Sequence, residues 1–467
     1  MLPLYKKLSW DARKIEKEAM KYLGNSLLKN FSGWIVGTSV SVLIFLRNFT
    51  GEQNYLLNNF WAEDGLFTLC YEKASFAACA LDSYSGYLVI YPRLISFLVS
   101  LFPLDLWALI NNVLYLFIVF LLAYFIFTIL HQMYSSFNSA LITISPFILA
   151  ISSDQILGVH SSLYLIVSAY LIMIVSTDLW IRDSSPVQKY LLSFLIFLHS
   201  LTTPIGLIIL LIMLFRITKN LNILNGFKST VLSSLFGCSI QIYSIFVASE
   251  DRDSLTDPIL VLKNSFNYFV KSVISIFYYP RDSRLEDPIF LQQGFEDFMY
   301  GNPIILISIG FLLFITPLLL RRDKFFHLQV ICYSSWANLF ILIISSYSYG
   351  SPYRFIVLVS VINIWIMVNL IEVIQNNFVK FISISFLIFP LLFNLITNFP
   401  VSGYRTSGPE WSKEIDSQFS FCLEPNNTNL YVPITFYPNW PTINPHTHGL
   451  YEPTTNLISC KQLLKSF

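Results

Sequence analysis

The string Trp61-Ala62-Glu63-Asp64-Gly65 places two adjacent carboxylates just after the first long apolar stretch of the chain. Charged residues make up only 12% of the sequence, against 55% hydrophobic residues, so charges beside an apolar run need a reason. A carboxylate at a membrane boundary can act as a general base, because desolvation and a neighbouring like charge both favour proton uptake. The flanking Trp61 and Gly65 predict a packed turn, and the alternative is a solvated turn with two ordinary charges.

Two arginines stand beside aromatic residues further along the chain. Arg93 follows a Tyr-Pro pair, and Arg354 lies between a tyrosine and a phenylalanine. A planar guanidinium pairs two oxygens of a phosphate group, so we predict that both arginines bind a substrate phosphate. The alternative for arginine at the end of a membrane span is snorkelling to lipid head groups.

Four more residues are predicted, on weaker grounds, to line the substrate site: Asp154, His160, Tyr87 and Trp61. The alternative for His160 is a solvated loop side chain. No metal site or other cofactor is expected, because the sequence has no HExxH string and His446-Thr447-His448 lacks further ligands nearby. A divalent metal would need oxygen ligands besides Glu63, from Asp154 or the acids at 282–297.

The elements that position these residues are expected to be membrane-spanning helices. The chain has 467 residues, 42 of them phenylalanine, and apolar runs long enough to cross a bilayer recur along it. These runs do not alternate with period two, so the predicted fold is an all-α polytopic membrane protein. We predict about eleven spans, at 31–49, 104–130, 138–153, 160–180, 189–203, 204–217, 229–249, 302–320, 326–347, 354–374 and 380–399. The stretch 189–217 is either two short helices broken at Thr203-Pro204 or one long kinked helix.

Loop charges give the expected orientation. A lysine- and arginine-rich segment, 1–30, precedes the first span and favours a cytoplasmic N-terminus. Threading the spans from there places Arg321, Arg322 and Lys324 inside and the acidic loop 250–301 outside. This fit favours the two-helix interpretation of 189–217, because one span fewer would move the acidic loop inside. With a net charge of +1, nothing points to nucleic-acid binding.

We predict a transmembrane domain at 31–399, with two long outer loops at 50–103 and 250–301. A C-terminal tail follows this domain on the outer side. The first outer loop, 50–103, contains two apolar segments, 65–80 and 88–102, that we interpret as interfacial helices. For 88–102 the alternative is another true span. The tail 400–467 is rich in turns, with a strand-like piece at 429–434, and predicts a small C-terminal mixed α/β or β-rich cap.

Four of the six cysteines fall on the predicted outer side: Cys70, Cys79, Cys422 and Cys460. An even number of cysteines in each outer segment fits disulfides in an oxidising compartment such as a bacterial periplasm. The alternative is four unrelated free thiols. A Cys70–Cys79 bridge requires a helix break, since a continuous helix would place the two sulfurs on opposite faces.

The predicted topology also limits the donor for any sugar chemistry. No cytoplasmic loop is large enough to hold a nucleotide-sugar-binding domain, so such chemistry is expected on the outer side. Nucleotide sugars are not available there. The donor is therefore expected to be a sugar on a lipid phosphate that has already been flipped.

The layout resembles the GT-C superfamily of integral membrane glycosyltransferases, which carry an acidic motif in the first outer loop. The strings Trp-Ala-Glu-Asp-Gly, Gly-Tyr-Leu-x-x-x-Pro-Arg-Leu and Tyr-Arg-Phe resemble a bacterial subset that includes the serotype-converting O-antigen glucosyltransferases, often phage-encoded. The resemblance covers the first outer loop and the span plan, and little of 104–345. It implies that Asp64 or Glu63 is the catalytic base, with Asp64 the acid typical of the superfamily.

The resemblance implies transfer of a hexose, with glucose as the expected sugar, from undecaprenyl phosphate to O-antigen units of lipopolysaccharide in the periplasm. It further implies a multi-pass protein of the bacterial inner membrane with a cytoplasmic N-terminus and a periplasmic C-terminus. Expected partners are the lipid-linked donor, the O-antigen acceptor, the bilayer, a cognate flippase and a donor-synthesising enzyme. Two alternatives stay open: an O-antigen polymerase, and a flippase for lipid-linked sugar. A flippase would need charges deep within spans, whereas most charges here lie in loops or near span ends.

Overall fold

The computed structural model describes residues 31–47, 62–83, 87–132, 134–150, 160–177, 186–219, 222–247, 265, 330–331, 333–338, 340–341, 352–398, 411–427, 430–434 and 457–464. Trp61, Asp154, the segment 1–30 and the predicted span 302–320 lie outside these residues, as does the loop 250–301 apart from residue 265. The described part of the chain is mostly helical and contains several apolar helices.

The described elements follow the apolar runs of the sequence. After a helix at Phe31–Arg47 come α3 (Ala62–Lys73), α4 (Phe76–Leu81), α5 (Ile90–Ser100), η1 (Leu104–Leu106), α6 (Trp107–Leu130), α7 (Ser136–Ala150), α8 (His160–Val175), α10 (Pro186–Ser200), α11 (Gly206–Lys219), α12 (Asn222–Val247), α17 (Pro352–Val373), α18 (Asn377–Asn398), α19 (Trp411–Cys422), β1 (Tyr431–Pro433), β2 (Leu457–Ser459) and α20 (Cys460–Leu463). Within the described residues, two helices are long and apolar enough to cross a membrane, Leu104–Leu130 and Lys228–Val247.

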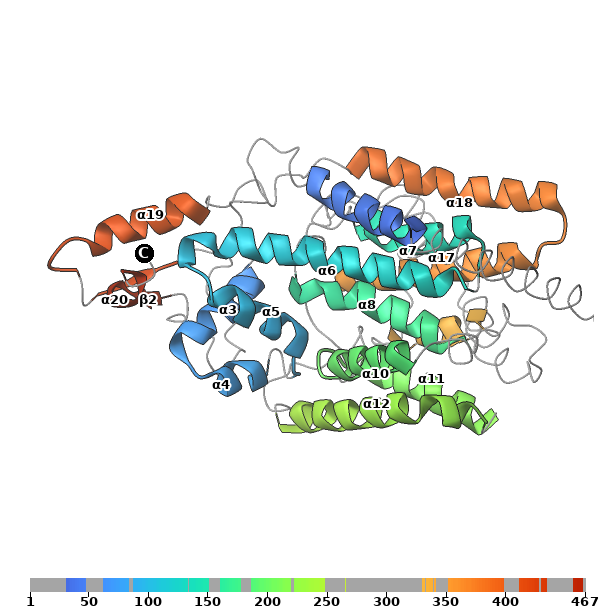
Figure 1. Ribbon diagram of the computed structural model, residues 1–467, viewed down its shortest axis with the longest axis horizontal. Helices are drawn as coiled ribbons and strands as arrows, with labels where there is room; N and C mark the ends of the chain where they lie inside the picture. The colour runs from blue at the N-terminus through green and yellow to red at the C-terminus, as the bar shows by residue number, and fades with distance from the viewer. Residues whose placement is uncertain are drawn as a thin grey trace, which may run out of the picture.

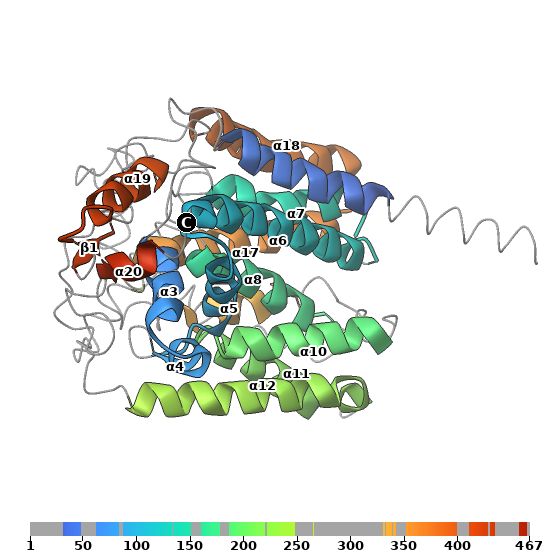
Figure 2. The same ribbon diagram turned by 60° about the vertical axis from the view of Figure 1, so that its left-hand side comes forward.

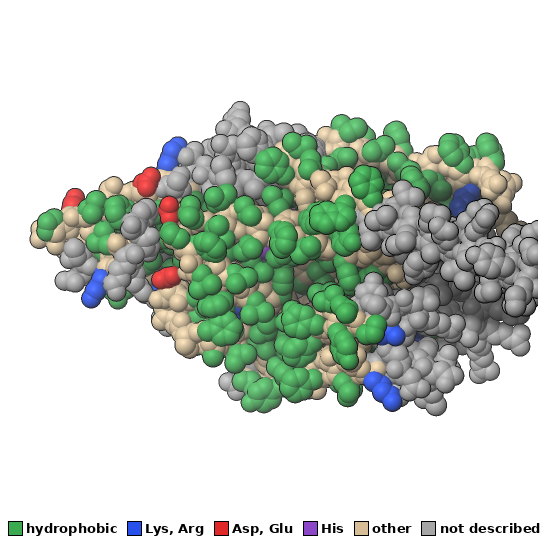
Figure 3. Space-filling view, in the orientation of Figure 1, with side chains coloured by type: hydrophobic (Ala, Val, Ile, Leu, Met, Phe, Trp, Pro, Cys, Tyr) green, Lys and Arg blue, Asp and Glu red, His purple; other side chains and the backbone are tan. Residues whose placement is uncertain are grey.

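The longer helices run side by side along the long axis of the molecule, and α3–α5 gather with the C-terminal elements at one end (Figure 1). Turning the molecule places α10, α11 and α12 on one flank and α18 with the Phe31–Arg47 helix on the other (Figure 2). Hydrophobic side chains cover most of the middle of the visible face, while charged side chains gather towards the two ends (Figure 3). An apolar middle with charged ends is typical of a helical bundle embedded in a bilayer.

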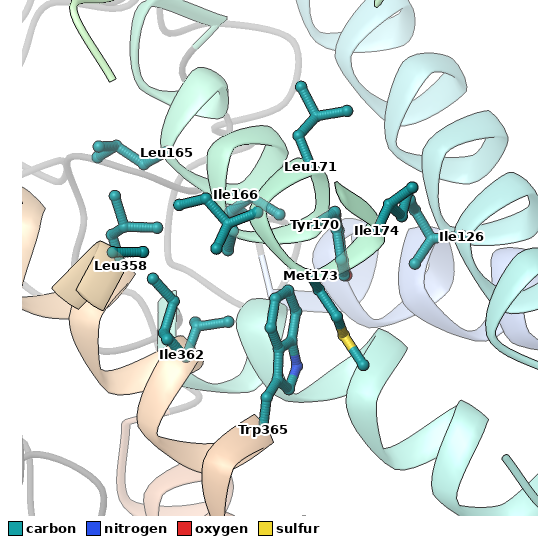
Figure 4. Packing of buried hydrophobic residues seen from close by; sticks show 14 of the residues in the cluster. Ile126, Leu165, Ile166, Tyr170, Leu171, Met173, Ile174, Leu358, Ile362 and Trp365 are labelled. Carbon is teal, nitrogen blue, oxygen red and sulfur yellow. The ribbon is translucent and has the colours of Figure 1, made fainter. Parts of the chain in front are cut away.

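Helix α8 lies at the centre of the main hydrophobic cluster. Its side chains from Ala169 to Val175 are all at most 2% exposed. Tyr170 stacks on Trp365 of α17 with ring centroids 5.7 Å apart, and Ile166 and Met173 surround this pair (Figure 4). A helix that is apolar on every side must be enclosed by other helices, so α8 is the natural core of the bundle.

Polar contacts tie the helices at the end of the bundle opposite α3–α5. The Tyr134 hydroxyl donates to Oδ1 of Asn369 over 2.9 Å. The Asn138 amide donates to Glu372, and Lys380 pairs with the same carboxylate at 2.5 Å. These contacts join α7, α17 and α18 where the connecting turns leave the apolar middle.

The stretch 189–217 forms two helices, as the two-helix interpretation expects. α10 ends at Ser200, α11 begins at Gly206, and a turn lies between them. A Cβ added at Gly206 would lie 2.7 Å from the Ser200 Cα, and one added at Gly237 would lie 2.8 Å from the Ser200 Cβ. Three helices therefore meet at Ser200, and two of them approach through glycine.

The C-terminal elements form a small mixed unit. β1 and β2 pair antiparallel with Val432 opposite Ile458, and a disulfide joins Cys422 to Cys460. The unit packs on the start of α6: the Trp411 indole donates to the Leu104 carbonyl at 2.9 Å and stacks on Trp107 with centroids 6.4 Å apart. Its buried side chains share one hydrophobic cluster with Leu69 of α3 and Ile95 of α5. The C-terminal unit is thus packed against α3, α5 and the start of α6.

The close approach at Ser200 predicts the effect of adding one methyl group. Gly206→Ala forces the new Cβ into the Ser200 backbone, so we expect a loss of about 1–3 kcal/mol of stability and a lower thermal unfolding midpoint in detergent. Ser239→Ala, at an exposed position of α12, is the control and should leave the midpoint unchanged. Equal midpoints for the wild type and Gly206→Ala would contradict the packing described here.

Candidate functional site

Asp64 lies in the first turn of helix α3, so the expectation of a packed turn is wrong. Ala62 to Lys73 form one helix that includes Gly65. The Thr68 hydroxyl donates to the Asp64 carbonyl at 2.8 Å, and the Ser96 hydroxyl of α5 reaches the same carbonyl at 3.4 Å. The Asp64 side chain is fully buried. The packed environment that the flanking residues indicated is present, but a helix provides it.

The Asp64 carboxylate meets the N-terminus of α8. The backbone N–H of His160 donates to Asp64 Oδ2 over 3.0 Å. His160 is the first residue of α8, and the first N–H groups of a helix have no partner within it. The positive end of the helix dipole stabilises a negative charge at this position. Asp64 therefore serves α8 as an N-cap side chain normally does, from 96 residues away.

The His160 ring is buried between two tyrosines and a backbone carbonyl. The alternative of a solvated loop side chain is wrong, because His160 is only 1% exposed. Its Nε2 lies 3.0 Å from the Asn111 carbonyl oxygen, and its Nδ1 lies 3.4 Å from the Tyr91 hydroxyl. The edge of the Tyr115 ring faces it with centroids 5.3 Å apart. The low-dielectric interior makes each of these polar contacts strong, so the ring is fixed in place.

Tyr91 is held in place by the helices around it. Its backbone N–H donates to Oγ1 of Thr202, in the turn between α10 and α11, at 3.1 Å. Three residues earlier, the Leu88 N–H donates to Oε1 of Gln241 in α12 over 3.2 Å, and Tyr87 beside it is half-buried. Burial raises the pKa of the Tyr91 phenol well above its usual value, and the nearby Tyr115 and the charge of Asp64 raise it further. Tyr91 is therefore a neutral hydroxyl beside the carboxylate.

Arg93 makes its described polar contacts within the helical hairpin. Nη1 donates to the Cys79 carbonyl at 2.6 Å, Nη2 pairs with Asp82 Oδ2 at 2.9 Å, and the guanidinium carbon lies 4.6 Å from the centre of the Phe67 ring. Arg93 is fully buried. Burial raises the pKa of the Asp82 carboxyl, and Arg93 offsets part of this rise. The predicted phosphate contact of Arg93 stays a prediction, since a phosphate would have to replace protein acceptors.

The predicted helix 65–80 is two helices, and the break permits a disulfide. α3 ends at Lys73, and the Ser75 side chain caps α4 by accepting the Ala78 N–H at 3.4 Å. The structure joins Cys70 to Cys79 with their Cα atoms 5.8 Å apart. Tyr71 donates its hydroxyl hydrogen to the Arg93 carbonyl at 2.9 Å, and burial raises its pKa to about 12. α3, α4 and α5 therefore form one cross-linked hairpin.

The structure brings Asp64 and His160 together and leaves other predicted residues outside what it describes. Glu63 lies in α3 and Arg354 in α17, and the side chains of both lie outside the described part. Trp61 and Asp154 lie outside the described residues altogether. Within the described residues, no group of three or more histidine, cysteine, aspartate or glutamate side chains is placed to hold a metal ion.

Asn111, Tyr115 and Thr202 belong to this site, and sequence reasoning did not single them out. The signal for Asn111 was present, since Asn111 and Asn112 interrupt an otherwise apolar helix of 24 residues. Polar side chains within such a helix face the bundle interior or a functional site. Tyr115 lies one turn further along the same helix. Thr202 has no local signal apart from the proline that follows the break.

Comparisons with protein-family models, with curated proteins and with solved structures found no match to this chain. The function is therefore argued from the arrangement of Asp64, His160 and their neighbours.

The buried pair of Arg93 and Asp82 predicts a stability effect that depends on pH. Asp82→Asn leaves a buried guanidinium facing a neutral acceptor, so we expect a loss of about 2 kcal/mol near neutral pH. The pKa of the Asp82 carboxyl is raised in the folded protein, so as the pH falls this carboxyl takes up a proton earlier in the folded protein than in the unfolded chain. The folded protein therefore binds this proton more readily than the unfolded chain, so the wild type gains stability as the pH falls and its advantage over Asp82→Asn should widen. Thermal unfolding at several pH values measures it, with exposed Asp416→Asn in α19 as the control. A gap that narrows in acid would contradict this dependence.

Proposed function

We propose that this chain is an integral membrane glycosyltransferase of the bacterial inner membrane. It transfers a hexose, with glucose as the first sugar to test, from undecaprenyl phosphate to O-antigen units on the periplasmic side. Asp64 is the proposed catalytic base and Glu63 a second carboxylate at the same site. The observation that carries the proposal is the buried Asp64 carboxylate held at the N-terminus of α8.

This geometry suits a base. A general base must be desolvated and held in a fixed orientation within hydrogen-bond reach of the hydroxyl that it deprotonates. Asp64 is fully buried, and His160 holds one of its oxygens at 3.0 Å. The neutral Tyr91 hydroxyl lies beside it. An acidic residue buried in an apolar bundle is costly, which favours a functional reason for its presence.

The proposed reaction balances with the groups named. The acceptor hydroxyl oxygen attacks C1 of the donor sugar and forms the new glycosidic bond. The bond between C1 and the phosphate oxygen breaks, and undecaprenyl phosphate leaves with the electron pair. The hydroxyl proton passes to the Asp64 carboxylate. Arg354, in the first turn of α17, is the first proposed ligand for the departing phosphate, because its charge would stabilise the leaving group.

The position of the disulfides supports an outward-facing site. Cys70–Cys79 lies in the hairpin that carries Asp64, and Cys422–Cys460 belongs to the C-terminal unit that packs beside it. Disulfides persist in oxidising compartments such as the bacterial periplasm. We therefore propose that α3–α5 and the C-terminal unit form the periplasmic end, with α3–α5 at the membrane interface and the C-terminal unit as a cap.

The first test is replacement of each carboxylate by its amide. Asp64→Asn should reduce sugar transfer on the order of 10²–10⁴-fold, because the amide cannot accept the proton. Glu63→Gln shows whether the second carboxylate shares the task. The readout is transfer from undecaprenyl-phosphate-linked glucose to O-antigen by the purified chain in lipid nanodiscs. Asp105→Asn, which changes an exposed acid at the same end of the bundle, should keep full activity.

Full activity in both Asp64→Asn and Glu63→Gln would contradict the proposal. The chemical structure of the O-antigen in the deletion strain separates the alternatives. Loss of a side-branch sugar with chain length retained supports the transferase. Loss of long chains would instead indicate a polymerase. Labelled lipid that crosses proteoliposomes without sugar transfer would indicate a flippase.

The proposed orientation predicts the state of the six cysteines. Cells are quenched with acid, and the denatured chain is then alkylated. This treatment should label Cys238 and Cys332, which lie within predicted spans. The other four should react only after reduction. Deleting the periplasmic thiol oxidase should expose those four, whereas deleting a cytoplasmic reductase should not. Four reactive outer cysteines in wild-type cells would contradict the periplasmic assignment.

A further inference from the structure

His160 occupies an unusual position, because one residue joins four helices. Its backbone N–H reaches α3 through Asp64, while its ring nitrogens reach α6 through Asn111 and α5 through Tyr91. The residue itself begins α8. The ring and the backbone of His160 thus point to different partners, and only the backbone contacts the proposed base.

The ring contacts define the protonation of the imidazole. The Asn111 carbonyl oxygen only accepts hydrogen bonds, so Nε2 must carry the hydrogen in this 3.0 Å contact. Nδ1 is then the acceptor for the Tyr91 hydroxyl at 3.4 Å. A neutral imidazole with its hydrogen on Nε2 satisfies both neighbours. This ring is therefore suited to hold a position.

We propose that His160 is a positioning residue for Asp64, whose ring anchors the first residue of α8 so that its N–H fixes the carboxylate for proton uptake. The proposal rests on the proposed function of Asp64 as the base. The ring prevents the start of α8 from turning or sliding relative to α3. A misplacement of about 1 Å in a reacting group can cost on the order of 10²-fold in rate, so a ring that never touches substrate can still control turnover.

The test compares two replacements of His160. His160→Gln can still donate to the Asn111 carbonyl, so kcat should stay within about threefold of the wild type. His160→Leu fills similar space without a donor, so kcat should fall about 100-fold while KM for undecaprenyl-phosphate-linked glucose stays unchanged. Tyr91→Phe removes only the hydroxyl that contacts Nδ1, and kcat should fall several-fold with KM again unchanged. All variants are assayed as full chains in lipid nanodiscs.

A matched control comes from the second buried histidine of the described bundle. His199 in α10 is 3% exposed, and its Nε2 lies 3.1 Å from the Ser168 hydroxyl. His199→Gln and His199→Leu should keep the wild-type kcat per folded molecule. Equal loss of kcat in the Leu variants of His160 and His199 would overturn the proposal, and so would wild-type kcat in His160→Leu. If His160→Leu does not fold, unchanged kcat in Tyr91→Phe overturns it.

A second measurement separates this inference from the proposed function. Hydrogen–deuterium exchange of the amides at 160–165 should be faster in His160→Leu than in the wild type, and unchanged in His199→Leu. If the wild type transfers no sugar, the proposed function fails, and this exchange difference still tests the anchor. Equal exchange in His160→Leu and the wild type would overturn the anchor even where sugar transfer is found.

Discussion

The hydrogen bond from the first N–H of α8 to the Asp64 carboxylate is the contact around which the bundle is arranged. α8 is enclosed along most of its length, and the residues at both of its ends, His160 and Val175, are buried. A helix end buried in this way needs partners from elsewhere in the chain. Asp64 of α3 provides one at the N-terminus. At the other end, Arg216 of α11 donates to the carbonyls of Val175 and Thr177. Each charge lies at the end of the helix dipole that stabilises it.

α5 connects this central helix to α3, α4 and the start of α6. It has only 11 residues, too few to cross a bilayer, yet it packs against α3, α4, α6 and α8. Thr202 and Gln241 hold its beginning, Ser96 joins it to α3, and Arg93 joins it to α4. The break between α10 and α11 therefore contributes to the site. It places the Thr202 hydroxyl where it accepts a hydrogen bond from the Tyr91 N–H, and the Tyr91 hydroxyl contacts the His160 ring.

The sequence predicts the helices well because hydrophobic runs are a local property. The ranges expected around 104–130, 189–203 and 204–217 coincide with described helices to within a few residues. The contacts between the site residues could not be predicted in this way, because they join parts of the chain that are far apart. His160 and Asp64 are 96 residues apart, and Asn111 accepts the His160 hydrogen bond through its backbone carbonyl, which no side-chain pattern reveals. The break after Lys73 was a condition for the Cys70–Cys79 bridge, but its place required the structure. Arg93 shows the limit most clearly, because its neighbours Asp82 and Cys79 are within the same loop and nothing in the spacing distinguishes them from a phosphate.

The two buried charges of the α3–α5 hairpin have different surroundings, and the difference bears on chemistry. Arg93 pairs with a full negative charge on Asp82. Asp64 receives a backbone N–H, which carries only a partial positive charge. Both kinds of contact stabilise the charged form of the side chain that they hold. The Arg93 guanidinium donates to Asp82 and to the Cys79 carbonyl, so these contacts hold it next to α4. The hairpin thus holds one buried charge through an ion pair with Asp82 and the other through the first N–H of α8.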